Sequence, residues 1–423
     1  MNIVEKNDRK EIILKLNDKL SESKFPHYWY GFKSFPMALY NFDEVYLVNY
    51  KELPEGYYVD GKVAIGKCTE KFAGNTIINL GGQCIVICNI DSLDEIIDLD
   101  KLYSKMVHEM FHGYQLENGD KRFPNEELYF TYKFTGEFLA LRIKEREYLL
   151  KAVFEEDENI RKELISDFIN TREYRCKLVG AGINYEYSIE SIEGTATYVE
   201  YKALQKETSL PKKYIIAKYG EKLIQSNELK DFRFSCYFSG MFIALIMDSL
   251  SECWQEEYSN SEVYLYNYLK EQIEWTPKEI VPQINAYTSY ILRNYEDSCK
   301  KELISFYIND GYNIILQGKF SITEFDPINT VSLDGKLLHK SSIKLNNKYI
   351  IKEKTLTTYE NNNVLSASSV EFFIKDEPLI TEGGIYIEDI GELKGKVIRT
   401  SKGYIVVFKQ PFVDIRVKGS DLK

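Results

Sequence analysis

Residues 105–115 read Lys105-Met106-Val107-His108-Glu109-Met110-Phe111-His112-Gly113-Tyr114-Gln115, and they hold two of the chain's four histidines. Four residues turn an α-helix by roughly 400°, so His108 and His112 are expected on the same helix face. Two imidazoles at this spacing can bind one zinc ion, and Glu109 beside them could accept a proton from a zinc-bound water. The stretch therefore predicts a helix that carries part of a metal site.

The residues around this motif favour a helix. No proline interrupts the stretch, and Ser104 is expected to cap the start of the helix. Apolar side chains recur at helical spacing at Leu102, Met106, Met110 and Phe111. Gly113 lowers helix propensity but allows another segment to approach closely. The competing interpretation is an amphipathic helix that carries two histidines by chance.

A catalytic zinc site usually has three protein ligands, and no third histidine lies near this motif. The other two histidines, His27 and His339, are expected to be structural or exposed. A carboxylate is therefore the expected third ligand, and Glu193 is the favoured candidate. Glu190, one helical turn earlier, is an alternative. Glu200 shares a helix face with Glu193, so it either supports the metal site from behind or is a solvated surface charge.

Two further segments complete the pattern, Glu193-Gly194-Thr195-Ala196-Thr197-Tyr198-Val199-Glu200 and Tyr237-Phe238-Ser239-Gly240. Together with the H-E-x-x-H sequence they resemble the E-G-x-x-x-Y-x-E and Y-x-x-G motifs of gluzincin metallopeptidases, in particular the aminopeptidase N and leukotriene hydrolase group. The resemblance covers about residues 100–250. It implies a zinc peptidase in which Glu193 is the third zinc ligand and Tyr237 stabilises the oxyanion of the reaction.

The chain departs from that group in two ways. First, 80 residues separate His112 from Glu193, where the group has a short spacing, so an insert at residues 120–180 is expected to form extra helices. Second, the group's G-x-M-E-N segment, which holds a free α-amino group, has no counterpart, because residues 79–83 contain no acidic residue. The resemblance therefore implies zinc chemistry, but it does not extend to aminopeptidase specificity, so internal and terminal cleavage both stay open.

The fold expected from the resemblance and from the apolar pattern is α+β, a thermolysin-like zincin. Its N-terminal α/β sheet region is expected at residues 1–100. A helix is predicted near residues 8–20, with strands at 37–40, 45–48 and 84–88. Residues 76–89 resemble in position the edge strand that pairs with the substrate backbone in such folds.

The rest of the chain divides into a helical and a β-rich region. Residues 101–310 are expected to form the helical, zinc-binding catalytic domain. Its further helices are predicted at residues 125–154, 159–178, 212–225, 232–250, 261–274 and 282–307. Short alternating runs and turn pairs such as Asp334-Gly335 predict a C-terminal, antiparallel β-rich domain at residues 311–423.

Composition narrows the classes of partner and the compartment. The chain has 423 residues, of which 44% are hydrophobic, and its net charge of −11 argues against nucleic acid and anionic membranes as partners. The longest apolar run, residues 236–247, is too short to span a bilayer, and the start has no apolar segment of signal-peptide length. Seven cysteines without regular spacing do not suggest disulfides. We therefore expect a cytoplasmic protein, and the resemblance implies that it acts on a peptide or protein substrate.

The hypothesis from the sequence is a peptidase with one zinc ion (Zn²⁺) per chain. His108, His112 and Glu193 bind the metal in this hypothesis. Glu109 is the general base, and Tyr237 donates a hydrogen bond to the oxyanion. The alternatives are a zinc hydrolase that acts on a small amide or an epoxide, and a catalytically inert protein that binds peptides on a peptidase scaffold. The presence of Glu109 argues against the inert protein, because such a scaffold needs no base.

Overall fold

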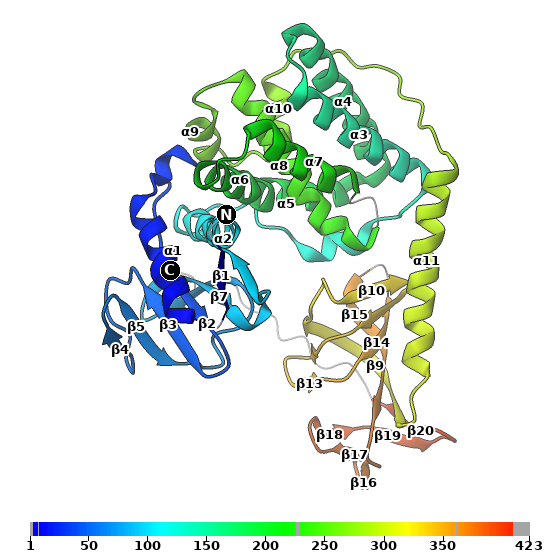
Figure 1. Ribbon diagram of the computed structural model, residues 1–423. Helices are drawn as coiled ribbons and strands as arrows, with labels where there is room; N and C mark the ends of the chain where they lie inside the picture. Colours follow the sequence, from blue (N-terminus) through cyan, green and yellow to red (C-terminus); the bar gives the residue numbers. More distant parts are fainter. Residues whose placement is uncertain (1–2, 7, 226–228, 361–362, 409–423) are drawn as a thin grey trace. The chain divides into compact units, whose positions relative to one another are not determined.

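The structure, a computed structural model, describes residues 3–6, 8–225, 229–360 and 363–408 (Figure 1). It is a mixed α/β protein, as the sequence predicted at this level. The chain forms two compact units. Unit 1 comprises the described residues up to Asn125 together with Thr135–Asn285, and unit 2 comprises Glu126–Phe134 and the described residues from Ala286 onward. The N-terminal sheet and the helical region, which the sequence suggested as separate regions, both lie in unit 1.

A six-stranded sheet forms the first part of unit 1. Its strands lie in the order β4-β5-β3-β2-β7-β6; β2 and β7 are parallel, and every other neighbouring pair is antiparallel. The bounds are β2 (Met37–Tyr40), β3 (Glu44–Val48), β4 (Tyr58–Asp60), β5 (Val63–Lys67), β6 (Thr76–Leu80) and β7 (Gln83–Asn89). A separate two-stranded sheet pairs β1 (Ile3–Glu5) with β8 (Ile96–Asp98). Among the described strands, β6 is an edge strand whose one partner is β7.

Side chains of this sheet alternate between two apolar layers. Met37 and Leu39 of β2 belong to the large core that also contains the helices of unit 1. Ala38 and Tyr40, the alternate residues of the same strand, belong to a second core on the opposite face. Because successive side chains of a strand point to opposite faces, a fully apolar strand is expected where both faces are covered.

Helices α1 (Arg9–Glu22) and α2 (Leu99–Glu117) pack into the large core against the sheet (Figure 1). The side chain of Asp98 caps α2, because it accepts hydrogen bonds from the backbone N–H groups of Asp100 and Lys101. The predicted cap, Ser104, is wrong. Ser104 lies inside α2, where its hydroxyl donates to the carbonyl of Lys101, and the earlier Asp98 already supplies the cap as strand β8 ends.

The remaining helices of unit 1 follow α2 in the chain, and α6 packs directly on α2. Their bounds are α3 (Gly136–Phe154), α4 (Glu158–Val179), α5 (Asn184–Ile189), α6 (Thr195–Glu207), α7 (Lys212–Gln225), α8 (Phe232–Leu250), α9 (Trp254–Ser259) and α10 (Leu265–Glu271). Helices α3 and α4 pack on each other and form most of the predicted insert. Within the described residues, no helix is both long enough and apolar enough to cross a membrane.

The predicted helix from residue 125 begins later than expected. Glu126–Phe134, which we call the aromatic strap, contains only the 3₁₀-helix η3 (Glu126–Thr131) and belongs to unit 2. Its Phe130 and Phe134 pack against Phe325 and Tyr295, which lie far along the chain. These distant aromatic contacts hold the strap outside the helix, and Thr135 then caps α3.

Unit 2 contains one long helix, α11 (Ala286–Tyr307), and β-sheets. The main sheet has the order β10-β11-β14-β15-β9-β12-β13, with β20 added beside β9 and β19 beside β20; β16, β17 and β18 form a smaller sheet. Its strands are β9 (Tyr312–Glu324), β10 (Thr330–Leu333), β11 (Lys336–His339), β12 (Ile343–Leu345), β13 (Tyr349–Ile351), β14 (Thr355–Glu360), β15 (Asn363–Ile374), β16 (Leu379–Thr381), β17 (Gly384–Ile387), β18 (Gly391–Lys394), β19 (Lys396–Arg399) and β20 (Gly403–Val407). Most pairs are antiparallel, as expected, but β20 runs parallel to β9.

The turn pair Asp334-Gly335 joins β10 to β11. Both residues have positive φ, 51° and 77°, and Leu333 pairs with Lys336 across the turn. A two-residue turn with this geometry is of type I′, for which Asp-Gly is a favoured sequence.

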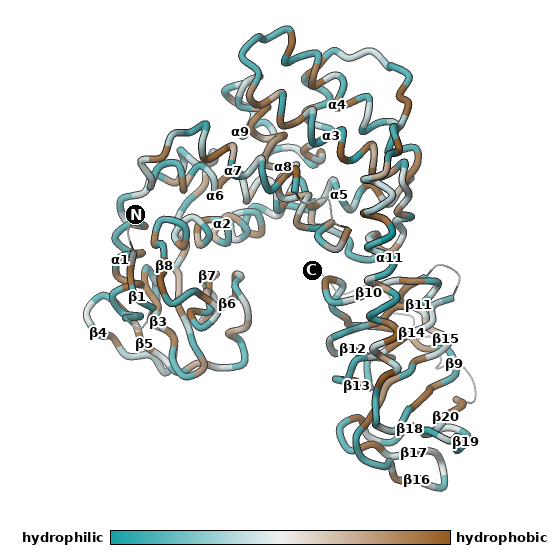
Figure 2. The backbone as a smooth tube through the Cα atoms, turned by 45° about the vertical axis from the view of Figure 1, so that its right-hand side comes forward, coloured by the Kyte–Doolittle hydropathy of each residue, from teal (hydrophilic) through white to brown (hydrophobic). Residues whose placement is uncertain are grey.

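Hydrophobic and hydrophilic residues alternate along the strands and helices of both units, so each unit buries an apolar core of its own (Figure 2).

Candidate metal centre

Helix α2 brings the two histidines of the motif together. The Nε2 atoms of His108 and His112 lie 3.2 Å apart, and both side chains are largely buried. Their rings meet edge to face, with centroids 4.8 Å apart. A single cation between the two Nε2 atoms would therefore contact both imidazoles.

The third residue comes from a long helical run over residues 184–207. This run contains a π-helical turn, η5 (Glu190–Gly194), between α5 and α6. A π-turn inserts an extra residue into a helix and is frequently found at functional sites. Glu193 lies within this turn, and its Oε2 atom is 3.4 Å from His108 Nε2 and 3.2 Å from His112 Nε2.

The three atoms have the spacing of one face of a metal tetrahedron. Ligand atoms about 2.0–2.2 Å from a tetrahedral zinc ion lie about 3.3–3.5 Å from one another. The three separations among His108, His112 and Glu193 are 3.2, 3.4 and 3.2 Å. These residues form the group of histidine, cysteine and acidic side chains within the described residues that could hold a metal ion.

The charges of the site favour a cation at this position. Although burial opposes the charged form of His108, its close contacts with the carboxylates of Glu193 and Glu200 raise its pKa to about 10. Burial likewise opposes the charged form of Glu193, but contacts with both imidazoles hold its pKa well below the usual value. The carboxylates thus stabilise positive charge between themselves and the imidazoles, as a proton or as a metal ion. The donor set, two imidazoles and one carboxylate, fits zinc.

Two glycines allow the third ligand to meet helix α8. A Cβ atom on Gly194 would lie 2.5 Å from the Cα atom of Gly240, and a Cβ atom on Gly240 would lie 2.5 Å from the carbonyl oxygen of Glu190. Only glycine fits at either position, because the neighbours are backbone atoms. This close contact packs η5 against α8 and brings Tyr237, one turn before Gly240, to the histidines.

Tyr237 lies over the metal site. Its ring stacks on that of His108, with centroids 6.3 Å apart and planes at 17°. Burial, followed by the charge of Glu193, raises the pKa of Tyr237, which keeps its hydroxyl protonated and able to donate. Glu109 is partly buried, and this burial raises the pKa of its carboxyl although both imidazoles oppose the shift. A raised pKa makes a carboxylate a better proton acceptor.

Glu200 supports His108 from behind. Its Oε2 atom is 3.3 Å from His108 Nδ1, an ion-pair distance, although the two groups are not aligned as a hydrogen bond. Its other oxygen accepts a 2.8 Å hydrogen bond from the Tyr219 hydroxyl. Glu200 is therefore buried and tied to the site rather than a solvated surface charge. A carboxylate behind a ligating imidazole orients the ring and increases its basicity.

Gln115 supports His112, a role that the sequence motifs did not predict. Its Oε1 atom is 2.8 Å from His112 Nδ1, and its Nε2 group donates to the carbonyl of Ile192 and to Thr195 Oγ1. One side chain thus fixes the ring of His112 and joins α2 to the turn that carries Glu193. Its position three residues after His112 on the same helix was the available signal.

Arg233 is a second residue that the sequence did not single out. Its guanidinium Nη2 lies 3.3 Å from Oε1 of Glu193, and Nη1 donates to the Tyr185 hydroxyl at 3.4 Å. Arg233 is one helical turn before Tyr237 on α8. A position four residues before a candidate tyrosine could have drawn attention to it, but its partner became visible only in the fold.

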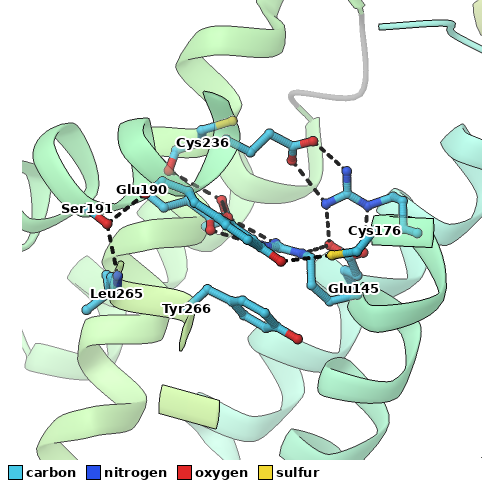
Figure 3. A network of polar contacts seen from close by, with 12 residues as sticks. Glu145, Cys176, Glu190, Ser191, Cys236, Leu265 and Tyr266 are labelled. Atoms are coloured by element: carbon cyan, nitrogen blue, oxygen red, sulfur yellow. Dashed lines mark hydrogen bonds and ion pairs between the residues drawn. The ribbon is translucent and has the colours of Figure 1, made fainter. Parts of the chain in front are cut away.

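The alternative ligand Glu190 is engaged elsewhere. Its two oxygens accept 2.9 Å hydrogen bonds from Arg172, and Ser239 donates to one of them. Arg172 also pairs with Glu145, so a fully buried network of arginines and glutamates lies behind the π-turn (Figure 3). The structure brings Glu193, and not Glu190, to the histidine pair.

The remaining histidines lie outside the site. His27 is exposed at the end of the 3₁₀-helix η1 (Phe25–His27). His339 is buried in unit 2, where its ring nitrogens contact the hydroxyls of Thr330 and Thr357.

Comparisons of the chain with protein-family models, with curated proteins and with solved structures found no match.

Proposed function

We propose that this protein is a zinc-dependent peptidase of the gluzincin type with a thermolysin-like catalytic unit. The observation that carries the proposal is the convergence of His108, His112 and Glu193 at the separations of a tetrahedral zinc site. In this proposal one zinc ion binds per chain. When bound there, zinc would act as a Lewis acid that lowers the pKa of a coordinated water to about 7.

Glu109 is the proton acceptor of the proposed reaction. It follows His108 directly on α2, and burial raises the pKa of its carboxyl. The partly buried carboxylate can take a proton from the attacking water and then pass it to the leaving amine. Glu109 is not one of the three proposed ligands, so its role in this proposal does not require it to bind the metal.

Tyr237 is the proposed donor to the oxyanion. Its hydroxyl remains protonated, because burial and the charge of Glu193 raise its pKa. A preorganised donor of this kind contributes roughly 3 kcal/mol to stabilisation of the transition state. The glycine contact between η5 and α8 holds the tyrosine close to the ligand set.

The edge strand β6 supports a peptide as the substrate. Ile77 of β6 packs directly on Gly113, the neighbour of His112, so the edge lies beside the metal helix. An extended peptide can add to an exposed sheet edge through backbone hydrogen bonds. This geometry favours cleavage of unfolded or flexible peptides over compact proteins.

The test compares two identical substitutions on helix α2. Purified wild type should contain one zinc per chain by elemental analysis and should cleave a library of synthetic peptides, read by mass spectrometry. Glu109→Gln should keep the zinc and lose cleavage. Glu117→Gln is the control, since Glu117 is at the exposed end of the same helix and pairs with Lys33.

Wild type that binds no zinc would refute the metal site. Zinc-loaded protein that leaves every peptide intact would exclude the peptidase and favour a small amide substrate. Unchanged cleavage by Glu109→Gln would show that another group accepts the proton.

A further inference from the structure

Arg233 connects the third ligand to the candidate oxyanion donor. It lies on α8 one turn before Tyr237, and its guanidinium reaches Oε1 of Glu193, whereas Oε2 is the oxygen recorded nearest to the imidazoles. Its side chain is 17% exposed and that of Glu193 13%, so water screens this pair only in part. Such a placement differs from that of an exposed surface ion pair, which contributes little.

A carboxylate can bind a metal through one oxygen or through both. In Glu193, Oε2 is the atom 3.2 and 3.4 Å from the imidazole nitrogens, whereas Oε1 is 3.3 Å from Arg233 Nη2. The nearest recorded partners of the two oxygens therefore differ. With Oε1 held by the arginine, Glu193 offers a cation one oxygen, and a fourth position stays open for water or substrate.

The guanidinium is itself held in place on its other side. Its Nη1 group donates to the Tyr185 hydroxyl, which belongs to α5, the helix that precedes the π-turn. Arg233 thus joins α8 to both ends of the segment that carries the ligand. The planar, forked guanidinium can make these two contacts at once, which a lysine ammonium cannot do with the same geometry.

We propose that Arg233 is a positioning residue that keeps Glu193 a one-oxygen metal ligand and thereby keeps the metal site four-coordinate. This inference rests on the metal site of the proposed function. It adds the means by which the chain sets the coordination number and keeps one position open for the reaction.

Cobalt(II) in place of zinc provides a direct readout, because its visible spectrum depends on coordination geometry. Four-coordinate cobalt absorbs more strongly and at longer wavelength than five- or six-coordinate cobalt. We expect an intense visible band for the wild type. In Arg233→Gln, the second oxygen of Glu193 is released to the metal, so the band should lose intensity and shift to shorter wavelength.

Two further variants separate this role from a general structural one. Arg233→Lys keeps the charge but loses the fork, and an intermediate spectrum is expected. Lys202→Gln is the matched control, because Lys202 pairs with Asp248 between α6 and α8 at comparable burial, away from the metal ligands. Its cobalt spectrum should equal that of the wild type. Circular dichroism checks the fold of each variant. If Arg233→Gln does not fold, the cobalt spectrum of Arg233→Lys tests the proposal instead.

A wild-type band in both Arg233 variants would overturn the positioning role and leave the peptidase proposal standing. A weak cobalt band in the wild type, with zinc bound at one ion per chain, would likewise overturn the positioning role and leave the peptidase proposal standing. Failure of the wild type to bind either cobalt or zinc would overturn both proposals.

Discussion

Gly194 and Gly240 meet backbone to backbone where the π-turn η5 packs on helix α8. Each glycine follows a candidate functional residue at short distance along its own helix, Glu193 directly before Gly194 and Tyr237 three residues before Gly240. The contact therefore fixes the distance between the proposed third ligand, Glu193, and the proposed oxyanion donor, Tyr237. This explains physically why a glycine stands in both motifs.

Gly240→Ala is expected to destabilise unit 1 by about 1–3 kcal/mol, because overpacking against backbone cannot be relieved by a side-chain movement. Zinc affinity should fall as well, since the added methyl group pushes η5 away from α8. Chemical unfolding and zinc titration measure the two effects. Gly220→Ala is the control: the added methyl would meet the movable end of the Leu150 side chain and would be in contact with the Phe242 ring at 3.4 Å, with no backbone atom among these neighbours, and alanine favours the helix. Equal stability of the two variants would contradict the packing argument.

Gln115→Ala should weaken zinc binding by about 10–100-fold, the usual cost of losing a group that orients a ligating histidine. The expected cause is a freed His112 ring and a loosened link to Ile192. Competition with a chromophoric chelator measures the affinity. Gln255→Ala removes a glutamine that instead bonds Tyr198 and the backbone of Tyr30. That control should bind zinc as the wild type does; an equal loss in both would assign the effect to general destabilisation.

Tyr237→Phe should lower kcat by about 10²–10³-fold with little change in KM, because the hydroxyl acts on charge that develops in the transition state. Zinc content should stay at one ion per chain, since Tyr237 is not a ligand in the proposed site. Steady-state kinetics on the best peptide from the library gives both constants. Tyr214→Phe, at a half-exposed position on α7, should behave as the wild type. A rise in KM alone would give Tyr237 a role in substrate binding instead.

Acid should weaken unit 2 through His339. Burial lowers the pKa of His339 from 6.5 to about 4, so below pH 6.5 the unfolded chain takes up a proton that the folded chain refuses. Stability is therefore lost as pH falls from 6.5 to 4, by up to roughly 3 kcal/mol. His339→Gln should remove this part of the pH dependence, whereas His27→Gln, at an exposed histidine, should keep it.

Urea unfolding at several pH values measures this effect. All three tryptophans, Trp29, Trp254 and Trp275, belong to unit 1, so their fluorescence reports that unit alone. Circular dichroism reports both units, and the difference between the two probes isolates unit 2. Parallel pH profiles for the wild type and His339→Gln would show that His339 is not the group responsible.

Local sequence patterns were enough to predict the bounds of several helices. The predicted helices at residues 212–225 and 232–250 coincide with α7 and α8, because the apolar positions recur at helical spacing throughout both. The start of α3 was predicted too early. The aromatic strap before it is apolar enough to suggest a helix, but its partners Phe325 and Tyr295 lie more than 150 residues further along the chain.

The candidate site likewise contains residues that local sequence motifs predicted and residues that they did not. The H-E-x-x-H pair and the glutamate before glycine are linear motifs, and the structure brings those residues together. The π-turn at Glu193 has no distinct local pattern, since its residues would also fit an ordinary helix. The roles of Gln115 and Arg233 depend on which helices meet, and that information lies in tertiary packing.

The aromatic strap has a practical consequence for dissecting the protein. Because Glu126–Phe134 leaves unit 1 and returns to it, the backbone passes between the units three times within the described residues. Truncation after Asn285 would thus remove Phe325 and Tyr295 but retain Phe130 and Phe134, now stripped of the aromatic rings they pack against. Stranded aromatic surface of this kind promotes aggregation. A soluble fragment that contains unit 1 alone would require a short polar linker in place of the strap as well as the shortened C-terminus.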